Sequence, residues 1–285
     1  MQPQIKSFYH APTFTFTYVV HDGQNPECAV IDPVLDFDNK SGNTSTESAD
    51  TVIQWLESQG LKLKWILETH AHADHITAAK YFQQQCGGDI AIGDHIHLVQ
   101  GVFKTVFNYG EEFIADGQQF DLTLRDNSTL ALGGMQIQIM HTPGHTPACI
   151  SYKVGDNIFV GDTLFMPDTG TARCDFPGGD AATLYDSIHK LLSFPDETHL
   201  YMCHDYPDGR DSREVCTVAE QKANNIHIGR GTSKADFIAM REQRDSTLDM
   251  PALILPSIQI NIRAGLLPEA EDNGVSYLKL PLNQF

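Results

Sequence analysis

The residues best suited to chemistry in this sequence lie between positions 69 and 75. The stretch reads THAHADH, so three imidazoles and one carboxylate fall within six residues. Neutral imidazole nitrogens and carboxylate oxygens bind divalent first-row metals. Alternation at i and i+2 directs side chains to one side of an extended segment, which disfavours a histidine-rich loop without function. The pattern predicts a metal site with the candidate ligands His70, His72, Asp74 and His75.

The segments around this cluster predict that it follows a β-strand. An apolar run over 63–68 precedes it, and a helical pattern over 76–86 follows. Open sheets with flanking helices form ligand crevices at the carboxyl ends of their strands. Other histidines and aspartates also occur where short strands are expected to end: His145, Asp162 and His204. We therefore expect several strand ends to converge on one metal centre.

The composition is that of a globular chain with a large acidic excess. The 285 residues are 41% hydrophobic and 20% charged, with a formal net charge of -18. This charge disfavours nucleic acids and anionic membranes as partners, because both bind Lys/Arg-rich surfaces. No apolar run approaches the roughly 18 residues that span a bilayer, and the start resembles neither a signal nor a transit peptide. Six dispersed cysteines without a C-x-x-C pair indicate reduced thiols and a cytoplasmic location.

The order of the expected elements indicates an α+β fold. Hydrophobic periodicity predicts strands within 14–31 and 120–161, and a polar surface loop over 36–46. Helices are expected over 95–107, 181–193, 213–227 and 233–245, and a last strand over 275–280. We expect a sandwich of two mixed sheets with helices outside. Residues 1–210 would form the catalytic domain, and 211–285 a mostly helical extension packed on the same domain.

Together, the candidate ligands resemble the signature of the metallo-β-lactamase superfamily. All seven positions are filled in order: His70, His72, Asp74, His75, His145, Asp162 and His204. The resemblance implies an αββα sandwich with the metal site between the sheet edges. In dinuclear members, the equivalents of His70, His72 and His145 hold one metal. The equivalents of Asp74, His75 and His204 hold the other, and that of Asp162 bridges them.

Several segments resemble the persulfide dioxygenase branch of this superfamily more specifically. They are 68–77, 143–147, 161–164, 173–176, 204–206 and 256–265. The chain is also similar, but less so, to hydroxyacylglutathione hydrolase (glyoxalase II). That enzyme carries Gly-Arg-aromatic-Phe-Glu and His-Glu-Tyr where this chain has RCDF and HDY. The 36–46 loop and the longer 95–127 segment depart from the short dioxygenases and are expected to reshape the substrate channel.

The dioxygenase resemblance implies one Fe(II) per chain. Its ligands would be His70, His145 and Asp162. Two histidines and one carboxylate on one face of Fe(II) leave positions open for a substrate sulfur and for dioxygen. The remaining four residues would surround these ligands and orient them and bound water. His72 would only support the ligands, whereas Asp74, His75 and His204 would have catalytic roles. The seven residues alone do not decide whether the site binds one metal ion or two. The alternative function is that of a thiolester hydrolase with two Zn ions.

The implied reaction is oxidation of glutathione persulfide by dioxygen and water to sulfite and glutathione. Candidate contacts for the glutathione carboxylates are Arg173, Tyr206, Arg210 and Lys222. Arginine suits bidentate contact with a carboxylate, and lysine acts as a point charge. Surface ion pairs are the competing explanation for each of these cations. The resemblance also suggests a homodimer.

Overall fold

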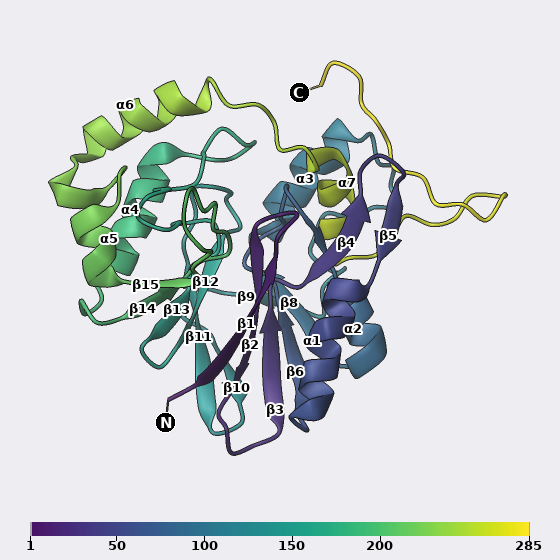
Figure 1. Ribbon diagram of the computed structural model, residues 1–285. Helices are drawn as coiled ribbons and strands as arrows, with labels where there is room; N and C mark the ends of the chain where they lie inside the picture. Colours follow the sequence, from purple (N-terminus) through teal and green to yellow (C-terminus); the bar gives the residue numbers. More distant parts are fainter. Residues whose placement is uncertain (1, 285) are drawn as a thin grey trace.

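The computed structural model describes residues 2–284 and contains two β-sheets that face each other, with helices outside (Figure 1). The first sheet has the order β1 (Gln4–His10), β2 (Thr15–His21), β3 (Glu27–Ile31), β6 (Lys62–Leu67), β8 (Asp89–Gly93) and β9 (Leu122–Leu124). The second has the order β10 (Thr129–Leu132), β11 (Met135–His141), β12 (Ile150–Val154), β13 (Asn157–Phe159), β14 (His199–Tyr201) and β15 (Val215–Thr217). A small sheet joins β5 (Asn43–Ser45), β4 (Val34–Asp38) and β7 (Ile76–Thr77).

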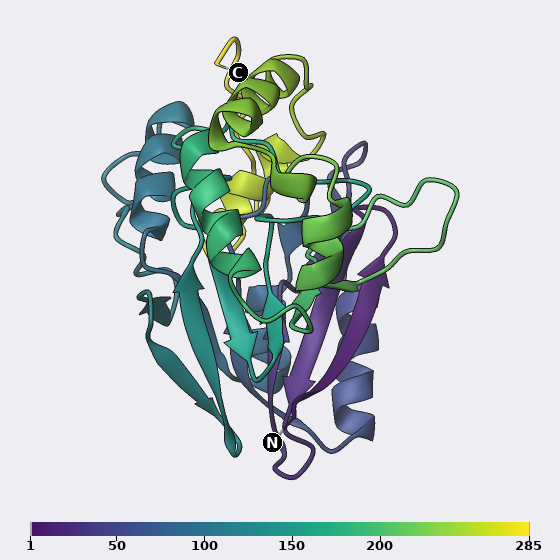
Figure 2. The same cartoon turned by 90° about the vertical axis from the view of Figure 1, so that its left-hand side faces the viewer.

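The helices cover the outer faces and one end of this sandwich. Helices α1 (Glu47–Ser58) and α2 (Ala79–Cys86) pack on the first sheet, and α4 (Ala181–Leu192) packs on the second with α5 (Val218–Asn224) beside it. Three helices lie at one end of the sheets (Figure 2): α3 (Ile96–Val106), α6 (Lys234–Asp245) and α7 (Ile254–Asn261). No described helix is both long and apolar enough to cross a membrane.

The core between the sheets comes from the inner faces of their strands. Tyr18, Leu67, Ile139 and Tyr152 belong to one apolar cluster and are at most 1% exposed. Strands β3, β6 and β8 run parallel, and the residues near their carboxyl ends are apolar and buried, as expected for parallel strands covered on both faces. Parallel strands end at the same edge of a sheet, so the segments after them are brought together.

The same arrangement occurs in both sheets. In the first, β3 and β6 are parallel, and Ile31 pairs with Leu67, each the last residue of its strand. In the second, β13 and β14 are parallel, and Phe159 pairs with Tyr201 in the same way. The segments that follow these four strands carry the residues of the site except His145, which follows β11.

The 36–46 segment is not a loop, and this expectation was wrong. Strands β4 and β5 form a hairpin there, and β4 also pairs with β7. The Asp38 carboxylate accepts hydrogen bonds from the Lys40 backbone and the Ser41 hydroxyl, and Gly42 takes a φ of 73°. Side-chain hydrogen bonding and a left-handed glycine make a tight turn, so polar composition concealed a hairpin.

Two other expected elements differ near the C-terminus. The helix expected over 213–227 is interrupted: β15 comes first, and α5 begins only after Thr217, which forms a capping box with Glu220. Residues 275–280 form no strand, because the Lys279 backbone hydrogen-bonds the Gln259 side chain in place of another strand.

Candidate metal centre

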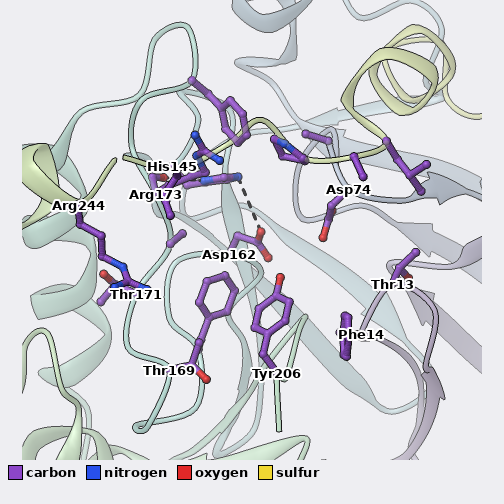
Figure 3. A pocket seen from close by; sticks show the side chains of 18 of the residues that line it. Thr13, Phe14, Asp74, His145, Asp162, Thr169, Thr171, Arg173, Tyr206 and Arg244 are labelled. Atoms are coloured by element: carbon purple, nitrogen blue, oxygen red, sulfur yellow. Dashed lines mark hydrogen bonds and ion pairs between the residues drawn. The ribbon is translucent and has the colours of Figure 1, made fainter. Parts of the chain in front are cut away.

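The seven sequence-predicted ligands meet at one edge of the sandwich. Four of them lie in the segment after β6, and the others follow β11, β13 and β14: His145, Asp162 and His204. Figure 3 shows His145, Asp162 and Asp74 projecting toward one cavity from separate segments of the chain. The structure therefore brings together residues up to 134 positions apart, counted from 70 to 204.

His70, His145 and Asp162, here called the triad, form one compact group. One ligand-type atom from each lies within 4.8 Å of those of the other two. The Nε2 atoms of both histidines are 3.8 Å from Asp162 Oδ2. The His145 Nδ1 hydrogen-bonds the Arg173 carbonyl at 2.8 Å, and the His70 Nδ1 contacts the Thr69 hydroxyl at 3.1 Å. Both imidazoles are thus held through Nδ1, which leaves Nε2 free to bind a metal ion.

The other four residues form a second compact group, here called the second cluster: His72, Asp74, His75 and His204. Its side chains already contact one another. The Asp74 carboxylate lies 3.2 Å from His204 Nε2 and 3.4 Å from His75 Nδ1. His204 Nε2 also lies 3.5 Å from Asp162 Oδ1, so the two groups adjoin.

Residues outside the expected set support both groups. The buried Asp32 carboxylate accepts from the Thr69 backbone at 2.8 Å and from His72 Nε2 at 3.0 Å. Asp32 has a φ of 48°, a left-handed conformation that aspartate tolerates better than most residues. Glu68 lies 3.4 Å from the same His72 nitrogen. Sequence reasoning missed Asp32, although its position directly after a buried strand was a signal.

Two further anchors come from distant parts of the chain. The Thr15 hydroxyl contacts Nδ1 of both His75 and His204, at 3.4 and 3.3 Å. The Asn261 amide on α7 donates to the carbonyls of His72 and His75, both at 2.8 Å. Helix α7 therefore fixes the backbone of the histidine-rich segment, although no metal-type residue lies on it.

Burial and neighbouring charges give the histidines different pKa values. Burial, with His72 nearby, lowers the pKa of His70 well below its ordinary value and that of His75 to about 3. Burial acts in the same direction on His72, but Asp32 and Glu68 raise the pKa of His72 well above its usual range. His70 and His75 are therefore neutral at pH 7, the form in which imidazole binds a metal.

The donor set fits a divalent metal ion. Buried polar atoms normally have hydrogen-bond partners, yet several buried atoms here have none. They are His70 Nε2, His72 Nδ1, His75 Nε2, His204 Nε2 and Asp162 Oδ1. Five unpaired nitrogen and oxygen atoms gathered in one place are the arrangement that a metal ion would satisfy.

The Cys203 thiol adjoins both groups. Its Sγ lies within 4.8 Å of ligand-type atoms of Asp162 and His204. Strand β14 ends at Tyr201 and the chain bends at Cys203, so the alternation of side chains along a strand does not apply there. All six cysteines are free, and burial raises the pKa of the Cys203 thiol well above its ordinary value.

A cavity of about 560 Å³ opens onto the triad. Its wall includes His145 and Asp162 of the triad and Asp74 of the second cluster, together with Phe165 and Phe176. The cavity is large enough for a small-molecule substrate, and aromatic walls with a few polar groups are typical of such sites. His72, His75 and His204 do not line it and are 0% exposed.

The four sequence-predicted substrate contacts divide between the cavity and the surface. Arg173 and Tyr206 line the cavity. Arg210 and Lys222 do not line it. Each forms ion pairs instead, as the competing explanation held: Arg210 with Asp168 and Asp205, and Lys222 with Asp196.

Helix α6 reaches the triad through a buried ion pair. Arg241 and Asp245, one turn apart, pair with each other at 1% and 5% exposure. Arg241 donates to the Thr171 carbonyl at 3.1 Å, and Asp245 accepts from the Cys174 backbone at 2.8 Å. The pair thus holds both ends of the short segment whose central carbonyl orients His145. No sequence signal marks this role, because an Arg and an Asp four residues apart on a helix usually form a surface pair.

A close approach behind His145 requires glycine. Gly144 has a φ of 138°, and a Cβ there would lie 2.4 Å from the backbone of Leu184 on α4. The Asp180 carboxylate caps this helix at Thr183. The loop that carries His145 therefore packs directly against the start of α4.

This fold and donor set define a class of metal-dependent enzymes. The sequence profile of the metallo-beta-lactamase superfamily matches residues 11–204, more than half of the chain. The chain belongs to this superfamily, which confirms the predicted α+β sandwich.

Relatives within the superfamily carry names of more than one activity. The chain is 54% identical to "Probable metallo-hydrolase" of Burkholderia pseudomallei, over 98% of this chain and 99% of that protein. It is 46% identical to "Glyoxylase B2" of Dictyostelium discoideum, over 98% and 97%. It is 28% identical to human "Persulfide dioxygenase ETHE1, mitochondrial", over 92% and 89%. The crystal structure of ETHE1 from Myxococcus xanthus is similar with a TM-score of 0.73 and 29% identity, covering 92% of this chain and 100% of that one.

Proposed function

We propose that this protein is an Fe(II)-dependent persulfide dioxygenase. The observation that carries the proposal is the triad, because two histidines and one carboxylate converge on one point beside a substrate-sized cavity. That ligand set is the one used by mononuclear non-haem iron oxygenases. Likeness to ETHE1 proteins over most of the chain supports the same activity.

The proposed reaction converts glutathione persulfide, dioxygen and water into glutathione and sulfite. The S–S bond breaks, the outer sulfur loses four electrons to dioxygen, and water supplies the third sulfite oxygen. Iron, when bound by the triad, supplies open coordination positions for the persulfide sulfur and for dioxygen.

The side chains of this protein prepare the site in three ways. The Arg173 carbonyl and the Thr69 hydroxyl fix the orientation of the triad imidazoles. The side chains of Phe165 and Phe176 form an apolar wall of the cavity that the reacting sulfur would enter. The second cluster, with Asp74 at the cavity wall, would orient bound water beside the reacting sulfur.

A second candidate is a dinuclear zinc thiolester hydrolase that acts on glutathione thioesters. The second cluster favours it, because four more ligand-type side chains adjoin the triad. The names of the relatives at 54% and 46% identity favour it as well. In such an enzyme the triad and the second cluster would together hold two Zn ions, which would supply an activated water for thioester hydrolysis.

One assay separates the two candidates. The purified protein is given glutathione persulfide while dioxygen uptake and sulfite are followed, and separately S-lactoylglutathione while hydrolysis is followed. We expect one dioxygen consumed per sulfite formed, and little thioester hydrolysis. Rapid hydrolysis without dioxygen uptake would replace the dioxygenase with the hydrolase.

A further inference from the structure

Three arginines line the cavity, and two of them are occupied within the protein. Arg173 donates to both oxygens of Asp175 and to the Asp249 carbonyl. Arg241 pairs with Asp245, as described above. The guanidinium groups of both residues are therefore already engaged with acceptors of the protein itself.

Arg244 is the third, and it differs from the other two. It lies in the last turn of α6, and its side chain extends beside Thr171 at the cavity (Figure 3). Within residues 2–284, its guanidinium forms no recorded ion pair or hydrogen bond. This is unexpected in a chain with 37 acidic and 19 basic residues, where Lys190, Lys222 and Lys234 are each paired with an aspartate.

His227 adds a second donor to the same wall. Its Nδ1 accepts a hydrogen bond from the Thr171 backbone at 3.0 Å, which places the ring proton on Nε2. Nε2 has no partner recorded within the described residues, and the ring lines the cavity. Burial, followed by the charges of Arg241 and Arg244, lowers the pKa of His227 to about 4, so the ring is a neutral donor at pH 7.

We propose that the Arg244 guanidinium and the His227 Nε2–H form a carboxylate-binding subsite for the thiol carrier, in the same cavity as the triad. A guanidinium with free donors binds a carboxylate through two parallel hydrogen bonds, and a neutral imidazole adds a third. The inference rests on the proposed function, in which the sulfur end of the same molecule reaches the triad. Arg244 thereby takes the role that the sequence suggested for Arg210 and Lys222.

The test compares two substrates that differ only in their carboxylates. They are glutathione persulfide and the persulfide of glutathione diethyl ester. For Arg244→Ala we expect the KM for glutathione persulfide to rise about tenfold, with kcat within about twofold, because a bidentate charge-assisted contact inside the cavity is lost. The KM for the ester should not change, and Arg244→Lys should lie between wild type and Arg244→Ala.

Lys234→Ala is the matched control. It removes one positive charge from the same helix, but Lys234 pairs with Asp186 and does not line the cavity. We expect wild-type KM values for both substrates. An unchanged KM for glutathione persulfide in Arg244→Ala would overturn the subsite, as would an equal rise for both substrates.

Calorimetry with glutathione itself separates this inference from the proposed function. Arg244→Ala should weaken glutathione binding about tenfold and leave binding of the diethyl ester unchanged. If the wild-type protein consumes no dioxygen, the dioxygenase proposal fails and this binding difference still decides the subsite. If dioxygen is consumed and the binding difference is absent, the subsite alone fails.

Discussion

The triad and the second cluster use similar residues but are held differently. In the triad, each imidazole is oriented through Nδ1 by one oxygen, and two of the three members line the cavity. In the second cluster, the three histidines are fully buried, and Asp74 is shared between two of them. Both groups keep unpaired ligand atoms, but the triad has more access to substrate, because the histidines of the second cluster do not line the cavity. Similar ligand residues thus lie in different surroundings within one signature.

Removing one histidine from each group tests this difference with the largest expected effect. His145→Ala should abolish iron binding and dioxygen uptake, because it removes a triad member. His72→Ala should retain much of the iron. Metal analysis of each purified variant measures this, and His189→Ala is a control, since His189 is exposed on α4 and stacks on Tyr185. Equal iron loss in the first two variants would make both groups part of one dinuclear site.

The ligand residues could be predicted from the sequence because they follow strand ends in a dense pattern. Asp32 also follows a strand end, but its role in holding His72 could not be predicted, since that contact depends on the parallel pairing of β3 with β6. Thr15 and Asn261 lie 60 and 186 residues from His75, and neither is a metal-type residue. Their roles depend on tertiary packing, which hydrophobic periodicity does not encode.

The pair on α6 gives a way to loosen the triad alone. Asp245→Ala leaves Arg241 as a buried unpaired charge, which should lower the free energy of unfolding by about 3–5 kcal/mol and weaken iron binding through the loop that orients His145. Urea denaturation and iron titration measure the two effects. The double variant Arg241→Met/Asp245→Leu should recover stability but not iron affinity. Full recovery of both would show that the pair serves packing only.

Asp32→Asn should disturb the second cluster more than the triad. The amide keeps the shape and the positive φ of residue 32 but removes the charge that holds His72. We expect iron content within about twofold of wild type and activity reduced roughly 10- to 100-fold, as for other outer-layer changes at metal sites. Loss of iron in parallel with activity would mean that the two groups are not separable.

Lys222→Ala should have the smallest effect. Lys222 pairs with Asp196 outside the cavity, and exposed ion pairs contribute about 0–1 kcal/mol. We expect wild-type KM and kcat with glutathione persulfide. A rise in KM comparable to that of Arg244→Ala would place the carboxylate contact at Lys222 instead.

The most direct test of the central claim is anomalous diffraction at the iron edge from crystals of the iron-loaded protein. The account predicts one iron peak per chain, within bonding distance of His70 Nε2, His145 Nε2 and an Asp162 oxygen. Two peaks per chain, or a single peak among Asp74, His75 and His204, would contradict it.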